Sequence, residues 1–248
     1  MMHETTDFGF RQVAKQDKQK LVEQVFTSVA DRYDLMNDLM SGGIHRLWKR
    51  HFVATSGIQK GHRVLDLAGG TGDIAQLLMP QVGSEGHVVL GDINQAMLDV
   101  GEARMIDAGF YGRFSCQQMN AEQLPCEDNS FDAITMAFGL RNVTDKQQAL
   151  NEMYRVLKPG GKALVLEFSK VTQPLLKKLY QLYSFKLLPE IGHRVTGDRD
   201  SYQYLVESIE KHPDQAQLKA MFEQAGLDMC RYQNLTAGIV AIHSGFKL

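Results

Sequence analysis

Two acids enclose the glycine-rich segment of the chain, which runs from Asp66 to Asp73 and has glycine at three of its eight positions. Small residues at the end of an apolar run let a ligand approach the backbone closely. A further acid, Asp92, ends the next apolar run, twenty residues after Gly72. A carboxylate at this spacing accepts hydrogen bonds from a ribose diol. The loop and the acid together predict a nucleotide-type cofactor at the carboxyl ends of two strands.

Two cofactor classes compete for this loop. Gly70, Gly72 and Ala75 fit the G-x-G-x-x-A fingerprint of dinucleotide binding, in which a helix N-terminus holds a pyrophosphate. Asp66 lies at the mouth of the same loop, however, and Asp73 opens the helix that follows. Two carboxylates repel a pyrophosphate and suit a cationic ligand such as the ammonium of a methionyl group. The charges therefore favour S-adenosylmethionine over NAD.

Short apolar runs that alternate with amphipathic stretches must position these side chains. The runs that predict strands are 63–68, 87–93, 114–119, 131–138 and 162–168. The stretches with helical spacing are 73–79, 94–108 and 146–157. Strands that are apolar on both faces and alternate with helices indicate a parallel sheet covered by helices. Two further strands, 228–234 and 238–247, are spaced as an antiparallel hairpin, so we expect an α/β fold with an antiparallel edge.

The rest of the chain is expected to complete a single domain. Its parts are an N-terminal helical cap (1–60), a cofactor-binding core (61–171), a substrate-cover insertion (172–212) and a C-terminal helix with the hairpin (213–248). We expect residues 1–20 to be loose and a helix to run from Leu21 to about Ala30. Within the insertion, 174–188 has the pattern of an amphipathic helix, whereas 192–204 is polar and typical of a loop.

Four motifs, in the same order, resemble those of the class I S-adenosylmethionine-dependent methyltransferases. They are Asp66–Gly72, Asp92, Met119–Glu122 with Leu124-Pro125, and Leu157–Gly161. The resemblance implies a Rossmann-like, mostly parallel seven-stranded sheet with helices on both faces and S-adenosylmethionine as cofactor. The cofactor contacts that it implies are Asp66, Gly69, Gly70, Thr71, Gly72, Asp92, Asn120, Ala121 and Ala137.

Rarer motifs, from about residue 20 to the end, resemble the ubiquinone/menaquinone biosynthesis C-methyltransferases. They are Tyr33–Trp48, Phe138–Val143, Arg155–Gly161 with Leu166–Ser169, and Thr236–Gly245. The resemblance implies methylation of a ring carbon of a polyprenylated hydroquinone, either demethylmenaquinol or 2-polyprenyl-6-methoxy-1,4-benzoquinol. Some members have serine at the position of Ala137, so a hydroxyl contact is absent here. A methyltransferase for another lipophilic acceptor, such as a sterol or fatty acyl chain, and a non-catalytic subunit of a quinone-synthesis complex stay open.

Four residues are candidates for assisting deprotonation of a ring hydroxyl. Arg141 is a permanent cation that either stabilises a developing phenolate or is a surface or ion-pairing arginine. Glu167, at the end of the fifth strand, either lines the pocket or is a buried carboxylate paired with an arginine. Asn142 either orients a water or caps the next helix. His45 titrates near neutrality and is the natural base, unless it holds the N-terminal segment against the core. Tyr33 is either part of a substrate lid or a hydrogen-bonded anchor.

Composition restricts the other partners. The chain has 27 basic and 29 acidic residues and a net charge of −2, which argues against nucleic acid. No apolar run approaches the roughly 20 residues of a spanning helix, and no hydrophobic signal region opens the sequence. Three cysteines without metal-ligand spacing and eight scattered histidines predict a reduced, cytoplasmic protein with no metal site.

A lipophilic quinol nevertheless requires some route to the membrane. We expect peripheral association with the inner face of the membrane or with a quinone-biosynthesis complex, and a homo-oligomer stays open. The apolar face of 174–188, which includes Leu179 and Tyr183, leads to the hypothesis that this helix also walls a groove for the isoprenoid tail.

Overall fold

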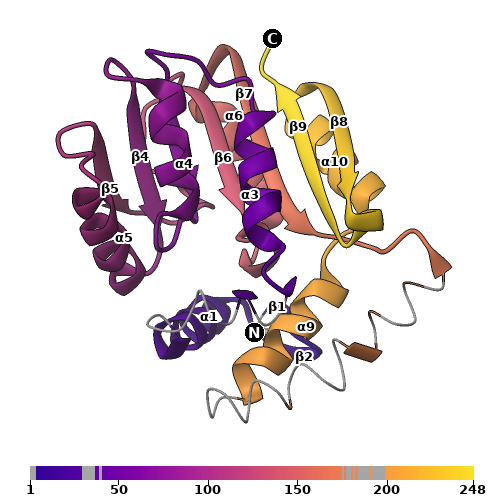
Figure 1. Ribbon diagram of the computed structural model, residues 1–248. Helices are drawn as coiled ribbons and strands as arrows, with labels where there is room; N and C mark the ends of the chain where they lie inside the picture. Colours follow the sequence, from indigo (N-terminus) through magenta and orange to yellow (C-terminus); the bar gives the residue numbers. More distant parts are fainter. Residues whose placement is uncertain are drawn as a thin grey trace.

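A seven-stranded sheet organises the molecule (Figure 1). The computed structural model describes residues 4–29, 37–38, 41–174, 176, 180, 182–183, 190 and 199–248. The strands of this sheet are β3 (Arg63–Leu67), β4 (His87–Asp92), β5 (Phe114–Gln118), β6 (Phe131–Ala137), β7 (Leu157–Phe168), β8 (Asp228–Leu235) and β9 (Val240–Phe246). Their order is β5-β4-β3-β6-β7-β9-β8. The five strands from β5 to β7 are parallel, whereas β9 and β8 are antiparallel, so the predicted α/β sheet with its antiparallel edge is confirmed.

Helices cover both faces of the sheet because the central strands are apolar on both sides. The main helices are α3 (His45–Ala54), α4 (Asp73–Val82), α5 (Gln95–Asp107), α6 (Lys146–Val156), α9 (Arg199–Lys211) and α10 (Gln215–Gln224). One core cluster joins α3, α4, α5 and α9 to one face, and a second joins α6 and α10 to the other. Asn94, Asp145 and Asp214 each cap a helix by accepting a backbone N–H bond.

The N-terminal additions lie beyond the carboxyl ends of the parallel strands (Figure 1). A hairpin of β1 (Thr5–Phe8) and β2 (Arg11–Ala14) leads directly into α1 (Lys15–Val29). The expectation that residues 1–20 are loose was therefore wrong, although 1–3 lie outside the described residues. The sequence did not predict the hairpin because its strands are short and polar. In addition, Phe8 packs on a residue far away in the chain, Tyr204 of α9.

The insertion also differs from its predicted form. Helix α9 begins at Arg199, within the stretch 192–204 that was expected to be a loop. Tyr202, Leu205 and Ile209 of this helix are buried at helical spacing, together with the small polar residues Ser201 and Ser208. Residues 192–198 and most of the predicted helix 174–188, Leu179 included, lie outside the described residues.

The ends of β3 and β6 approach each other where the strand order reverses direction. Ala68 and Phe138 follow these two strands, and both have positive φ, +53° and +58°. A Cβ on Gly139 would lie only 2.5 Å from the Cβ of Ala68. Non-glycine residues in this conformation carry strain, which clusters at functional sites. Open α/β sheets bind ligands at this point, so the backbone alone directs attention to it.

Helix α5 packs unusually close to the turn that follows β3, and this contact yields a testable prediction. A Cβ at Gly101 would lie 2.7 Å from Leu90 Cδ2 and 3.0 Å from the carbonyl oxygen of Gly70. Gly101→Ala should raise helix propensity by about 1 kcal/mol. Overpacking costs about 1–3 kcal/mol, so we expect a net loss of unfolding free energy in urea titrations.

Glu102→Ala is the matched control, because Glu102 is exposed in the same helix. Its unfolding free energy should stay within about 0.5 kcal/mol of the parent. A Gly101→Ala protein as stable as the Glu102→Ala protein would show that α5 does not limit the space above the turn.

Candidate active site

A cleft of about 840 Å³ opens where β3, β4 and β6 end beneath α1. Its polar lining includes Asp92 and Asn142, and its apolar lining includes Val22, Met97 and Phe138. A mainly apolar cleft with a few convergent polar groups is the usual form of a small-molecule site. Of the nine expected cofactor contacts, four line this cleft: Gly70, Asp92, Asn120 and Ala121.

The glycine turn and Asp92 form one hydrogen-bonded unit at the cleft. The backbone N–H of Gly70 donates to Asp92 Oδ2 at 2.9 Å, and the N–H of Asn94 donates to Oδ1 at 2.9 Å. Each carboxylate oxygen retains a lone pair for a further donor. Gly70 has a φ of +55°, which favours glycine there. Asp92 is thus fixed in place by the backbone, with accepting capacity directed to a ligand.

A second, smaller hollow of about 360 Å³ lies on the other side of the turn and includes buried Asp66. Asp66 Oδ1 accepts a hydrogen bond of 2.8 Å from the Thr135 hydroxyl, which ties β3 to β6. Asp66 Oδ2 has no hydrogen-bond partner among the described residues. Burial raises the pKa of Asp66 to about 7, against the opposing effects of Thr135 and the Ala75 amide. An orphaned, buried carboxylate oxygen suits a cationic group.

The remaining expected cofactor contacts have different surroundings. Gly69, Thr71 and Ala137 line this second hollow. Gly69 leaves no room for a side chain, since a Cβ would lie 2.8 Å from Asp66 Oδ2. Gly72 lines neither space and instead begins α4 with a φ of +82°.

Asp73 does not act as the sequence argument assumed. Its carboxylate pairs with Lys49 at 2.6 Å and with Arg104 at 2.9 Å. Burial alone would raise its pKa, but these two cations hold the pKa of Asp73 below its usual value. Asp73 opens the helix as expected, but Lys49 and Arg104 balance the charge with which it was expected to repel a pyrophosphate. Asp73 still lines the smaller hollow beside Asp66, whereas Glu23, Asp92 and Glu122 are the acids that line the cleft.

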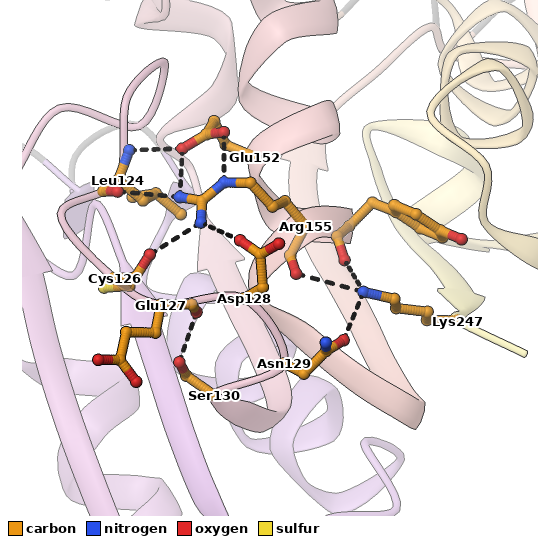
Figure 2. Close-up of polar contacts among 10 residues, drawn as sticks. Leu124, Cys126, Glu127, Asp128, Asn129, Ser130, Glu152, Arg155 and Lys247 are labelled. Atoms are coloured by element: carbon orange, nitrogen blue, oxygen red, sulfur yellow. Dashed lines mark hydrogen bonds and ion pairs between the residues drawn. The ribbon is translucent and has the colours of Figure 1, made fainter.

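The segment after β5, which carries Asn120 and Ala121, is held by Arg155 of α6 (Figure 2). The guanidinium donates to the carbonyls of Leu124 at 2.9 Å and Cys126 at 2.8 Å. It also pairs with Glu152 and Asp128, and Glu152 accepts from the N–H of Leu124 at 2.7 Å.

Lys247 adds a tie from the end of the chain by donating to the carbonyls of Tyr154 and Arg155 and to Asn129 Oδ1 (Figure 2). The sequence motif contained Arg155, but its role depends on partners up to 31 residues away in the chain. The network therefore gives one wall of the cleft a fixed form.

Arg141 and Asn142, adjacent in sequence, have different environments. Arg141 is buried and pairs with Glu167 at 3.1 Å, while it also donates to the carbonyl of Phe138. It is not among the residues that line the cleft. Asn142 lines the cleft, and Asp145 caps the helix for which Asn142 was a candidate cap. The catalytic roles of both residues stay predictions.

Of the two N-terminal candidates, the structure describes only His45, which lines neither space. His45 is buried, and its Nε2 lies 2.9 Å from Asp38 Oδ1. Burial lowers its pKa despite that carboxylate. This contact corresponds to the anchoring interpretation of His45. Tyr33 lies outside the described residues.

Sequence reasoning missed the residues that α1 and α9 bring to the site. Gln19, Val22 and Glu23 of α1 line the cleft, and the Tyr204 hydroxyl of α9 donates to Asn142 Oδ1 at 3.1 Å. The predicted helix around Val22 carried a signal for burial, but none for what it buries. Tyr204 lay in the stretch expected to be a loop.

Comparison with known proteins shows which family the chain belongs to. The model of the ubiE/COQ5 methyltransferase family matches residues 11–247. The chain belongs to this family. It is 64% identical over 244 residues to the ubiquinone/menaquinone biosynthesis C-methyltransferase UbiE of Stenotrophomonas maltophilia, covering 98% of this chain and 96% of the relative. It is 63% identical over the same shares to the UbiE of Xanthomonas campestris.

Solved structures show the same fold at low identity. A possible histamine N-methyltransferase from Thermotoga maritima, described as S-adenosylmethionine-dependent, matches with a TM-score of 0.65 and 18% identity, over 91% of this chain and 99% of that one. A methyltransferase of the same dependence from Aquifex aeolicus matches with a TM-score of 0.58 and 16% identity, over 95% and 100%. The Rossmann-like methyltransferase fold is therefore confirmed.

The described residues contain neither a membrane-spanning helix nor a cluster of metal ligands. No helix in this part of the chain has both the length and the apolar character needed to cross a membrane. No group of three or more His, Cys, Asp or Glu side chains within it could hold a metal ion.

The buried carboxylate of Asp66 predicts a pH-dependent stability. Its pKa of about 7 in the folded protein lies above the ordinary value of 3.8, so its contribution to stability is complete below the unfolded pKa and is lost as pH rises through 7. Asp66→Asn keeps an acceptor for Thr135 and removes the titration. We expect its advantage in unfolding free energy to grow between pH 5 and 7, by at most about 1.4 kcal/mol per unit.

Urea titrations of both proteins at pH 5, 6, 7 and 8 measure this difference, and other titrating groups cancel in it. Above pH 7 the difference should level off. A constant difference across the series would contradict the raised pKa of Asp66.

Proposed function

We propose that the protein transfers a methyl group to a ring carbon of a polyprenylated hydroquinone in ubiquinone or menaquinone biosynthesis. The observation that carries the proposal is the family match over residues 11–247, together with a relative 64% identical over nearly the whole chain. The cleft supports it, because acidic groups and a mainly apolar wall meet there. Demethylmenaquinol and 2-polyprenyl-6-methoxy-1,4-benzoquinol are the substrates that this assignment implies.

The methyl donor is S-adenosylmethionine, and the residues present fit it. Asp92 would accept from the ribose hydroxyls, and Asn120 and Ala121 would flank the adenine. The unpartnered Oδ2 of Asp66 suits the ammonium of the methionyl group. The bound cofactor supplies an electrophilic methyl group on a sulfonium. The protein has to hold that group in line with the ring carbon and exclude water.

The quinol end of the site has to make a ring carbon nucleophilic. We propose that Asn142 donates from its amide to a ring hydroxyl oxygen and so stabilises the negative charge that develops on that oxygen as electron density moves into the ring. Phe138 beside it belongs to an aromatic group with Trp48 and Phe168, and Trp48 donates to Thr236 Oγ1 at 2.8 Å. These apolar rings would suit an aromatic acceptor.

Arg141 and His45 hold segments next to the cleft in place without lining the cleft themselves. Arg141 and Glu167 form a buried pair that holds the turn after β6, and this turn presents Asn142. We propose that His45 and Asp38 anchor the segment that precedes α3. Direct contact of Arg141, His45 or Tyr33 with the quinol stays a prediction.

Turnover with each quinol tests the assignment directly. The purified protein, isotopically labelled S-adenosylmethionine and either reduced demethylquinone should yield a labelled ring-methyl product, identified by mass spectrometry. Methylation of a sterol or fatty acyl acceptor instead would support the alternative lipophilic substrate. Cofactor binding without turnover of either quinol would favour a non-catalytic subunit.

Asp92 provides a prediction on cofactor affinity. Asp92→Ala removes the proposed ribose acceptor, and hydrogen bonds to a charged group contribute about 1.5–3 kcal/mol. The dissociation constant of S-adenosylhomocysteine, from isothermal titration, should rise about 10- to 100-fold. Asp128→Ala is the control, since Asp128 pairs with Arg155 and does not line the cleft. Equal effects of the two substitutions would remove Asp92 from the cofactor site.

We also propose that the protein meets its quinol at an anionic membrane surface. Ile44 and Leu47 at the start of α3 are 41% and 62% exposed, and Arg50 is exposed one turn further. Exposed apolar side chains beside a cation suit the headgroup region of a bilayer. Trp48, next to Leu47, packs against Phe138 at the cleft, so this surface adjoins the site.

Sedimentation with vesicles that contain phosphatidylglycerol tests this surface. Replacing Ile44 and Leu47 by serine should weaken vesicle binding at least about tenfold, given about 25 cal/mol per Å² of apolar burial. Tyr111→Ser, at a site 82% exposed, should leave binding unchanged. The proposal would be overturned if the parent protein does not bind the vesicles but forms a dimer or a complex with other quinone-synthesis proteins.

A further inference from the structure

Tyr204 is the point where three separate parts of the chain meet at the cleft. Its ring stacks on Phe8 of the N-terminal hairpin, with centroids 4.3 Å apart. It shares a small apolar cluster with Phe8 and Val22 of α1, and Val22 itself lines the cleft. Its hydroxyl reaches Asn142, after β6, at 3.1 Å. All three members of this cluster are buried.

The burial of Tyr204 decides which way the amide of Asn142 faces. A buried hydroxyl needs an acceptor for its proton, and Asn142 Oδ1 is the hydrogen-bond acceptor described for it. Burial also raises the pKa of Tyr204, which keeps the hydroxyl protonated as a donor. With Oδ1 engaged, the Nδ2 group of Asn142 has no hydrogen bond to a described residue. Asn142 lines the cleft, so its amide N–H groups are left for a ligand there.

We propose that Tyr204 is a positioning residue that orients the Asn142 amide so that Nδ2 donates to a ring oxygen of the quinol. This inference rests on the proposed function and extends it to helix α9 of the insertion. The covering elements α1, α9 and the hairpin thereby affect reactivity as well as access. Removing the hydroxyl would let the amide rotate and present an acceptor where the reaction needs a donor.

Tyr204→Phe is the central test, since phenylalanine keeps the ring that stacks on Phe8. We expect kcat for quinol methylation to fall about tenfold, the value of one hydrogen bond. The dissociation constant of S-adenosylhomocysteine and the thermal midpoint should stay close to the parent's. Tyr202→Phe, a buried tyrosine of the same helix that belongs to a different core cluster, should leave kcat unchanged.

The Asn142 variants determine whether the effect passes through the amide. Asn142→Ala should lower kcat at least tenfold, and adding Tyr204→Phe to it should change kcat less than twofold. Asn142→Asp keeps the acceptor for Tyr204 but offers oxygen in place of N–H, so kcat should fall as far as in Asn142→Ala.

Three results would overturn the inference while the parent enzyme still turns over. They are an additive double variant, full activity in Asn142→Asp, and a Tyr204→Phe loss that appears in the thermal midpoint or cofactor affinity and not in kcat. A parent protein without quinol turnover would instead refute the proposed function, so the two failures are distinguishable.

Discussion

The buried carboxylate of Asp66 imposes the arrangement on which the site depends. Thr135 holds one of its oxygens across β3 and β6, at the place where the sheet reverses its strand order. The other oxygen lies under the turn, and a side chain on Gly69 would collide with it. A carboxylate in such a position destabilises the empty protein, because burial opposes its charge. The fold keeps an energetically unfavourable group where a cationic ligand would satisfy it.

The pairing of the neighbouring charges decides what kind of ligand the turn accepts. Lys49 and Arg104 are the cations that could attract a pyrophosphate to this helix start, and Asp73 occupies both. Asp66 lies beside the paired Asp73 in the smaller hollow, and Asp92 lines the cleft together with Glu23 and Glu122. The preference for a sulfonium-type cofactor over a dinucleotide therefore arises from which charges are neutralised. Counting the acids in the sequence gives the same preference, although it includes Asp73, whose charge two cations balance.

The cleft is completed by segments that are far apart in the chain. Val22 of α1 forms part of its wall, and Tyr204 of α9 fixes the orientation of Asn142. Arg155 of α6 fixes the wall that carries Asn120 and Ala121 through carbonyls of the segment after β5. Helix α9 also belongs to the large core cluster on one face of the sheet, so we propose that these segments complete one active site.

Local pattern in the sequence determined the strands of the sheet, most of its covering helices and the loop residues expected at the cofactor site, because strand and helix periodicity and backbone freedom depend on neighbours within a few positions. The exception among the helices is α9, which begins in a stretch expected to be a loop. Asp92 and the glycine turn were predictable for that reason. Only the tertiary structure decided that Asp73 is neutralised, that Arg141 pairs with Glu167, and that Tyr204 reaches Asn142. Each of these depends on a partner between 24 and 62 residues away, and an isolated sequence contains no signal for which distant side chains meet.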